Sequence, residues 1–238
     1  MTIKRVYVVH RNAALQHHEF APRWKQHSEL AQTFPDLVHQ YPRLAYCCTL
    51  EQDPGIPGAS RRYDGVGMLW LRSDDLVAVQ PADPRVRPVM QEDELRVFQD
   101  KMLNAMMTVD EDVRKDGRGA RFGLISFLTS RPGLDAEAFA GACVRHADAI
   151  LAAPELAAAI RRLVIGRVMG TPTFASDGVL ELWFDSAQDA VRACNTAAYR
   201  AVVLDAQADF ALPEPLTLLT EIGHAWSAVD DPHPKPFP

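Results

Sequence analysis

The chain has 238 residues, of which 47% are hydrophobic and 24% are charged, with a formal net charge of -6. This composition is typical of a globular protein, and the length allows one large domain or two small ones. An acidic chain of this kind argues against nucleic acid as a partner, because phosphates need a basic surface. The sequence shows no long apolar run and no apolar leader, so we expect a cytoplasmic protein without a membrane partner.

The four cysteines do not form the paired spacings of a zinc site. The histidines likewise show no metal-ligand motif such as H-E-x-x-H. We therefore expect reduced, mostly buried thiols and no metal ion.

The two halves of the sequence repeat one another. An aromatic and histidine pattern at residues 20–27 recurs at residues 139–146, and an Asp-Gly-Val motif at 64–66 recurs at 177–179. The order of the matches is preserved, with one shorter loop in the second half. This predicts two tandem copies, residues 1–116 and 120–228, followed by a proline-rich tail at 229–238.

Each copy shows the same order of elements. Short β-branched and aromatic runs predict strands, and capped amphipathic stretches between them predict helices. The expected strands are residues 6–9, 44–50, 64–71 and 102–109 in the first copy, and 124–128, 162–169, 177–184 and 216–222 in the second. The helices expected in the second copy are residues 136–151, capped by Asp135, and 187–196, capped by Ser186, with a further helical stretch at 199–210.

The order βαββαβ is that of the split ferredoxin-like fold. Such a unit carries its helices on one face of the sheet, and the other face has to be covered. We therefore predict an α+β fold in which the two repeats pack their sheets together as an α/β barrel. In the first helix, Phe20, Trp24 and His27 are spaced to share one face, as are Phe139, Cys143 and His146 in the second copy.

The motifs of the first copy resemble the EthD family of the dimeric α/β-barrel superfamily. They are Phe20-x3-Trp24-x2-His27, Tyr63-Asp64-Gly65-Val66-x2-Leu69-Trp70 and Asp93-Glu94-x3-Phe98-x-Asp100. The second copy departs from the pattern at Cys143 and Ser176, which suggests that it kept the fold and lost a pocket. The resemblance implies a cleft between helix and sheet. It does not fix the reaction, because the superfamily includes cyclases, decarboxylases, isomerases, cofactor-free monooxygenases and haem enzymes.

We selected candidate site residues by their chemistry. Histidine can exchange a proton near neutral pH, and a phenol can stabilise a developing oxyanion. The candidate catalytic residues are His27, Tyr46, Tyr63 and His146. The candidate substrate-binding residues are Phe20, Trp24, His10, Asp64 and Trp70. Each also has a structural interpretation: a histidine bonded within the core, a packed aromatic side chain or an Asp-Gly turn.

Three functions remain open on the sequence. The first is a cofactor-independent lyase, cyclase or isomerase that uses histidine to transfer a proton on a small, hydrophobic, oxygenated molecule such as an aromatic acid, lactone or polyketide fragment. The second is a haem enzyme with His146 or His224 as the ligand. The third is a non-catalytic protein that binds a small molecule. A homodimer is a further expectation.

Overall fold

The computed structural model describes residues 2–72 and 83–231. The first repeat contains β1 (Ile3–Val9), α1 (His17–Gln32), α2 (Pro35–Gln40), β2 (Arg43–Thr49), β3 (Gly65–Trp70), α3 (Val86–Val97), the 3-10 helix η1 (Met102–Ala105) and β4 (Met106–Asp116). The second contains β5 (Phe122–Leu128), α4 (Ala136–Ala152), α5 (Pro154–Ala159), β6 (Arg162–Met169), β7 (Gly178–Phe184), α6 (Ala187–Cys194), the π-helix η2 (Tyr199–Asp205) and β8 (Leu216–Ser227).

The strands of the described residues form a closed antiparallel barrel in the order β1-β3-β2-β8-β5-β7-β6-β4. Within each repeat the order is that of a ferredoxin-like sheet, with the first strand between the fourth and the third. The two sheets join because β2 pairs with β8 and β4 pairs with β6. Closure leaves no free sheet edge and confirms the predicted α+β barrel of two repeats.

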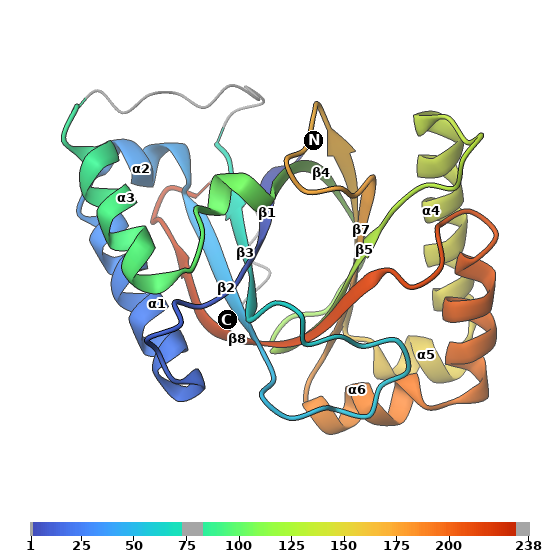
Figure 1. Ribbon diagram of the computed structural model, residues 1–238. Coiled ribbons are helices and arrows are strands. Elements are labelled where there is room, and N and C mark those ends of the chain that lie inside the picture. The colour runs from blue at the N-terminus through green and yellow to red at the C-terminus, as the bar shows by residue number, and fades with distance from the viewer. Residues whose placement is uncertain (1, 73–82, 232–238) are drawn as a thin grey trace.

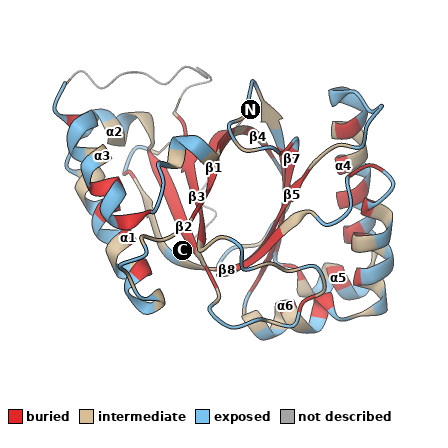
Figure 2. Ribbon diagram, in the orientation of Figure 1, coloured by how far each residue is buried: buried red, intermediate tan, exposed pale blue. Residues whose placement is uncertain are grey.

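The helices of each repeat cover the outer surface of that repeat's own sheet. Figure 1 shows α1, α2 and α3 on one side of the barrel and α4, α5 and α6 on the other. Figure 2 shows that buried residues lie on the strands and on the helix faces that turn toward them. Asp135 and Ser186 cap α4 and α6 as predicted, since their side chains accept hydrogen bonds from the backbone of Ala138 and Asp189.

The last strand of each repeat differs from the sequence prediction. Residues 102–105 form η1, so β4 begins later than expected and continues to Asp116. Strand β8 likewise extends beyond the predicted residue 222 to Ser227. Both strands are long because each pairs with a strand of its own repeat and with a strand of the other repeat. The local sequence does not reveal the partner strand in the other repeat, so the sequence prediction ended these strands too early or began them at the wrong residue.

Alternation along the strands separates the barrel interior from the helix-covered outer face. In β1, Val6 and Val8 point into the barrel interior, whereas Tyr7 and Val9 belong to the cluster under the helices. The interior also encloses an ion pair in which Lys4 Nζ lies 2.5 Å from Glu181 Oε1. The described residues of the barrel interior therefore form a buried apolar cluster with an enclosed ion pair.

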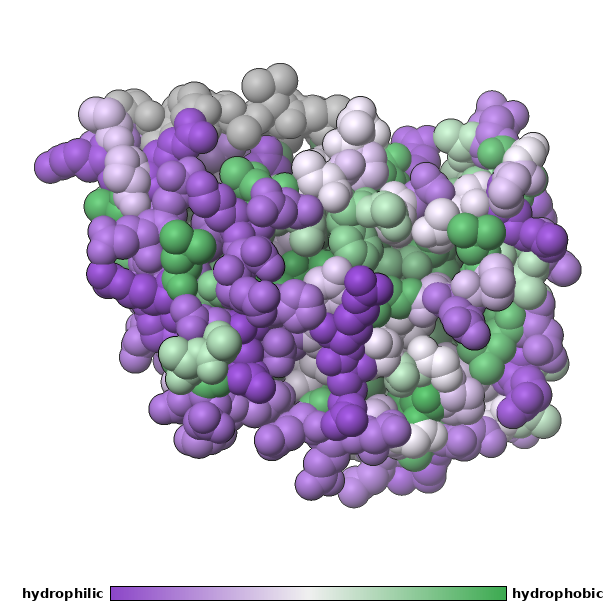
Figure 3. All heavy atoms as spheres, in the orientation of Figure 1, coloured by the Kyte–Doolittle hydropathy of each residue, from purple (hydrophilic) through white to green (hydrophobic). Residues whose placement is uncertain are grey.

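The described surface is largely polar over the first repeat. In the space-filling view, hydrophilic residues dominate the side formed by α1 and α3, and less polar residues gather between the two helical layers (Figure 3).

Within residues 2–72 and 83–231, no helix has both the length and the apolar character that a membrane-spanning helix requires. Of the predicted tail at 229–238, residues 232–238 lie outside the described residues. Asp231 pairs with Arg43 at 2.8 Å.

Candidate functional site

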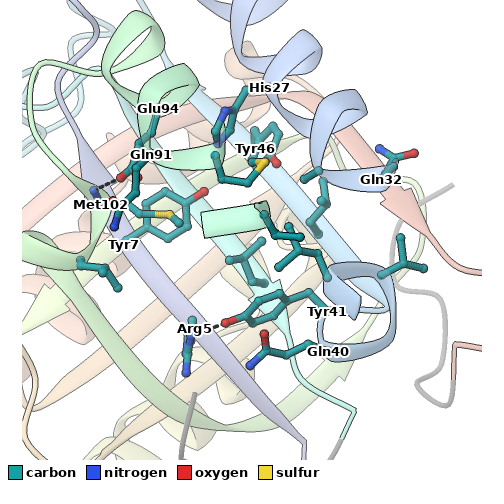
Figure 4. A pocket seen from close by; sticks show the side chains of 18 of the residues that line it. Arg5, Tyr7, His27, Gln32, Gln40, Tyr41, Tyr46, Gln91, Glu94 and Met102 are labelled. Carbon is teal, nitrogen blue, oxygen red and sulfur yellow. Dashed lines mark hydrogen bonds between the residues drawn. The ribbon is translucent and has the colours of Figure 1, made fainter. Parts of the chain in front are cut away.

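A cavity of about 240 Å³ lies between the helices of the first repeat and the outer face of its sheet. Strands β1, β2 and β3 form its floor, and residues of α1, α2, α3 and η1 form its walls. Figure 4 shows polar side chains at two ends. His27, Tyr46, Tyr7 and Glu94 lie toward one end, and Arg5, Tyr41 and Gln40 lie toward the other. Between them the walls are mostly apolar, with Leu37, Val38, Leu44, Leu69, Val86, Met90, Leu103 and Trp226.

A glycine on the neighbouring strand accommodates Tyr7. Tyr7 stands opposite Gly67 in the pairing of β1 with β3. A Cβ at residue 67 would lie 2.1 Å from Tyr7 Cζ and 2.4 Å from its hydroxyl oxygen, so any larger residue would displace the ring. A glycine inside a strand often marks such a close approach.

His27 is held by an acid from another helix. Its Nδ1 lies 2.8 Å from Asp93 Oδ2, which joins α1 to α3. The guanidinium of Arg23 also donates to Asp93. Because an ionised carboxylate only accepts hydrogen bonds, this network assigns the imidazole proton to Nδ1 and leaves Nε2 with its lone pair.

Burial sets the charge state of this pair. Burial lowers the pKa of His27 below its ordinary value, and the hydrogen bond to Asp93 opposes that shift without cancelling it. For Asp93, burial raises the pKa, but the hydrogen bonds from Arg23 and His27 outweigh it and the pKa lies below the usual range. At neutral pH the site therefore holds a neutral imidazole and an ionised carboxylate.

The two tyrosines near His27 remain protonated. Burial raises the pKa of Tyr7 and of Tyr46 above the ordinary value for a phenol. Tyr46 is fixed in place by Trp24, whose ring stacks on it at a centroid distance of 4.5 Å and an angle of 14°. Both phenols can therefore act as hydrogen-bond donors across a wide pH range.

Four of the candidate residues from the sequence meet at this site. His27 and Tyr46 line the cavity. Phe20 and Trp24 lie behind the lining, in the buried cluster that also contains Tyr7 and Tyr46. They support the site through packing, and neither is among the residues that line the cavity.

His10, Tyr63 and Asp64 form a separate group where β1 ends and β3 begins. The rings of His10 and Tyr63 stack at 4.5 Å, and Asp64 accepts hydrogen bonds from the backbone and side chain of Arg11, each at 3.1 Å. None of the three lines the cavity. Asp64 has the turn-stabilising role that its Asp-Gly sequence favours.

Trp70 lies on the opposite face of the sheet. It belongs to the cluster inside the barrel, and its indole Nε1 donates to Glu111 Oε2 at 2.6 Å. The strand carries it away from the cavity because successive side chains alternate between the two faces.

The second repeat has apolar side chains at the equivalent strand positions. The pair that corresponds to Tyr7 and Gly67 is Ser126 and Leu180. Leu124, Leu163, Ile165, Leu180 and Leu182 pack there with α4 and η2 in one apolar cluster. Hollows of about 760 and 490 Å³ nevertheless border α4, so the loss of a pocket in the second copy stays a prediction.

His146 occupies the position of His27 in the second repeat without its acid. Its Nε2 is buried and has no hydrogen-bond partner among the described residues, and burial lowers its pKa to about 4. Asp205, which matches Asp93 in the sequence repeat, is exposed. His146 lines a groove between α4 and residues 206–210, next to the ring of Phe210 at 5.2 Å.

The histidines proposed as haem ligands do not fit that role. The Nε2 atoms of His146 and His224 are both covered by protein atoms, so neither presents an open nitrogen to an iron atom. The groove that His146 lines has a volume of about 760 Å³, so the covered Nε2, and not a lack of space, argues against haem there. Among the described residues, no group of three or more His, Cys, Asp or Glu side chains is placed to hold a metal ion.

Arg5, Tyr7 and Asp93 were not selected as site residues from the sequence. The alternation in β1 places Arg5 and Tyr7 on the face that helices cover, which is an unusual place for two polar side chains and was a usable signal. Asp93 is 66 residues from His27 and on another helix, so its contact with His27 follows from the tertiary fold.

The comparisons with known proteins support the fold. Residues 131–214 match the model of the EthD domain. The chain is similar to the crystal structure of a putative monooxygenase from Fusobacterium nucleatum subsp. nucleatum ATCC 25586, with 7% identity, a TM-score of 0.61, and coverage of 95% of this chain and 94% of that chain. No curated protein matches the sequence significantly.

Two further solved structures have the same architecture. An anthrone oxidase-like protein is 11% identical, with a TM-score of 0.60 and coverage of 97% of this chain and 94% of that chain. A putative chlorite dismutase is 12% identical, with a TM-score of 0.55 and coverage of 93% and 95%. At these identities the likeness concerns the fold alone. Residues 131–214 therefore match the EthD domain, in a chain that has the dimeric α/β-barrel fold with both halves in one polypeptide.

Proposed function

We propose that this chain is a cofactor-independent enzyme of the lyase, cyclase or isomerase type, which transfers a proton on a small, flat, oxygenated molecule. The observation that carries the proposal is the His27–Asp93 pair at one end of an apolar cavity, with Nδ1 and Oδ2 2.8 Å apart. An oriented, neutral imidazole beside a hydrophobic pocket is the arrangement expected of a general base.

In this proposal His27 acts through Nε2. Asp93 accepts the Nδ1 proton and thereby fixes the tautomer and the direction of the ring. Removal of a proton from carbon next to a substrate carbonyl would place negative charge on the carbonyl oxygen. The hydroxyls of Tyr46 and Tyr7, kept protonated by burial, would donate to that oxygen, and protonated His27 would return the proton at another atom.

The apolar walls support this chemistry in two ways. They favour the binding of a flat hydrophobic molecule, and they exclude water, which strengthens each hydrogen bond to the developing charge. Two proteins of similar structure are described as a putative monooxygenase and as anthrone oxidase-like. Both descriptions refer to enzymes that act on small molecules.

The proposal is tested by the exchange of an acidic C–H group with solvent. 2-Tetralone, a flat bicyclic ketone, is incubated in D2O with the protein, and deuterium incorporation is followed by NMR. The wild type should accelerate exchange, and His27→Gln should reduce the enzymatic rate by about 100-fold or more. His18→Gln, which changes an exposed histidine on the same helix, is the matched control and should retain the rate. Exchange that is equally fast with His27→Gln would refute the proposed role of His27.

A further inference from the structure

We infer that the Arg5 end of the cavity binds a carboxylate, so that the ligand is a flat hydrophobic acid. This inference rests on the proposed function in one respect, namely that the same cavity holds the substrate. It goes further by naming the chemical class of that substrate.

Arg5 is a buried cation that has no acidic partner among the described residues. The residue is only 8% exposed, and its guanidinium donates to the hydroxyl of Tyr41 and lies 5.4 Å from the centre of that ring. In the part of the chain that the structure describes, no Asp or Glu forms an ion pair with it. A phenol is neutral, so the contact with Tyr41 orients the guanidinium and does not compensate its charge within the described residues.

Two other buried arginines show what a compensated guanidinium looks like in this protein. Arg43 lies 2.8 Å from an oxygen of Asp231, and Arg162 lies 2.9 Å from an oxygen of Glu111. Burial of an unpaired charge is costly, and proteins normally supply a partner of opposite sign. Arg5 lines the cavity instead, and this placement points to a ligand as the partner of its charge.

The remaining charges around the cavity favour an anion at this end. Glu94 is the single carboxylate among the described residues of the lining, and Figure 4 shows it at the end opposite Arg5. Its Oε1 accepts a hydrogen bond from the backbone of Met102 at 2.5 Å, and burial raises its pKa. Arg87 of α3 also lines the cavity, but it is exposed, so solvent screens its charge.

The spacing of the two polar ends sets the shape of the acid. Arg5 and Tyr7 are two residues apart on the same face of β1, so their Cα atoms are about 7 Å apart. A guanidinium offers a planar pair of donors that suits a carboxylate. The acid should therefore carry its carboxylate about one aromatic ring away from the oxygenated carbon that reaches Tyr7 and His27.

The test compares two probes of the same shape by isothermal titration calorimetry at pH 7.5. The probes are 2-naphthoate, which is an anion, and 2-naphthamide, which is neutral. The wild type should bind 2-naphthoate at least about 30-fold more tightly than 2-naphthamide. Arg5→Gln should remove this preference and leave 2-naphthamide binding within about threefold. Arg87→Gln, which removes an exposed charge, should weaken 2-naphthoate binding by no more than about threefold.

Equal affinity of the wild type for the two probes overturns the inference without any variant. It is also overturned if a folded Arg5→Gln protein keeps the preference, or if Arg87→Gln loses as much affinity as Arg5→Gln. Should Arg5→Gln fail to fold, as circular dichroism would show, Arg5→Lys replaces it. That variant keeps the charge without the planar donors and should lose about tenfold in 2-naphthoate affinity, and an unchanged affinity contradicts the assignment.

The two proposals can fail separately. Arg5 and His27 lie at opposite ends of the cavity, so the preference for the anion and the deuterium exchange depend on different side chains. If the preference for the anion holds and deuterium exchange is absent, the proposed reaction is refuted and the assignment of the carboxylate stands. If exchange depends on His27 and the two probes bind equally, the proposed reaction stands and the assignment of the carboxylate is refuted.

Discussion

The phenol ring of Tyr7 occupies the space that a side chain at residue 67 would need, and residue 67 is a glycine. In the second repeat the paired positions hold Ser126 and Leu180, so the small and large residues are exchanged between the strands. This exchange replaces a phenol with an apolar side chain on the face under the helices. Tyr7 therefore places a phenol on the floor of the first-repeat cavity, and the second repeat has no tyrosine at that position.

Gly67→Ala tests this close approach. The new methyl group would lie 2.1 Å from Tyr7 Cζ, so the ring must move, and we expect a loss of about 1–3 kcal/mol in the free energy of unfolding. Urea denaturation followed by fluorescence measures the loss. Gly141→Ala in α4 is the control and should be neutral or stabilising by up to about 1 kcal/mol, because its nearest neighbour is the flexible end of Arg145. Equal stability of the Gly67→Ala protein and the wild type would show that Tyr7 has room to shift.

The pH dependence of exchange should report on His27. The imidazole must be neutral to accept a proton, so the rate should fall as the pH decreases through the pKa of His27, below the usual 6.5. Asp93→Asn removes the hydrogen bond that raises this pKa and leaves Arg23, whose charge lowers it. The midpoint should therefore move to still lower pH, with a plateau rate reduced by about tenfold. A midpoint that moves upward would contradict the proposed pairing.

Tyr46→Phe separates catalysis from binding. Removal of one donor to the developing oxyanion should lower kcat by about 100-fold while KM changes little. Since the ring and its stacking on Trp24 are retained, the stability should change by no more than about 1 kcal/mol. Tyr199→Phe is the matched control, a buried tyrosine of the second repeat, and should leave kcat unchanged. If Tyr46→Phe raises KM alone, Tyr46 serves in binding only.

The fold could be predicted from the sequence because its determinants are local or repeated. Strand composition and the recurring motifs at residues 20–27 and 139–146 indicated two βαββαβ units, and the helical spacing of Phe20, Trp24 and His27 showed which face meets the sheet. The pairing of β2 with β8 and of β4 with β6 could not be derived locally, and this is why the last strands are longer than predicted.

The site was only partly predictable, for a different physical reason. His27 and Tyr46 follow from helix and strand periodicity, but Asp93 reaches His27 only through the packing of α3 on α1. Tyr63 and His10 have side chains that are common in catalytic sites. They stack on each other near the start of β3 and do not line the cavity. The cavity itself depends on side-chain volumes at facing positions such as Tyr7 and Gly67, which a motif does not encode.

His146 should make the protein sensitive to acid. Its pKa is about 4 in the folded protein and about 6.5 when unfolded, so between these values the unfolded state binds more protons. The stability present above pH 6.5 should therefore decline as the pH falls toward 4, by about 3 kcal/mol from this residue at about 1.4 kcal/mol per pKa unit. Denaturation curves of His146→Leu at several pH values should show a shallower decline, with stability at pH 7 within about 1 kcal/mol of the wild type. The exposed His18→Gln should keep the wild-type slope, and an identical slope for His146→Leu would contradict the low pKa.

The central claim is that a small molecule binds under the helices of the first repeat and not inside the barrel. Methionine methyl NMR tests it most directly, because Met90 and Met102 line the cavity whereas Met68 and Met107 belong to the barrel interior. Titration with 2-naphthoate should shift the Met90 and Met102 methyl signals through the ring current of the probe and leave those of Met68 and Met107 in place. Shifts at Met68 and Met107 without shifts at Met90 and Met102 would contradict the claim.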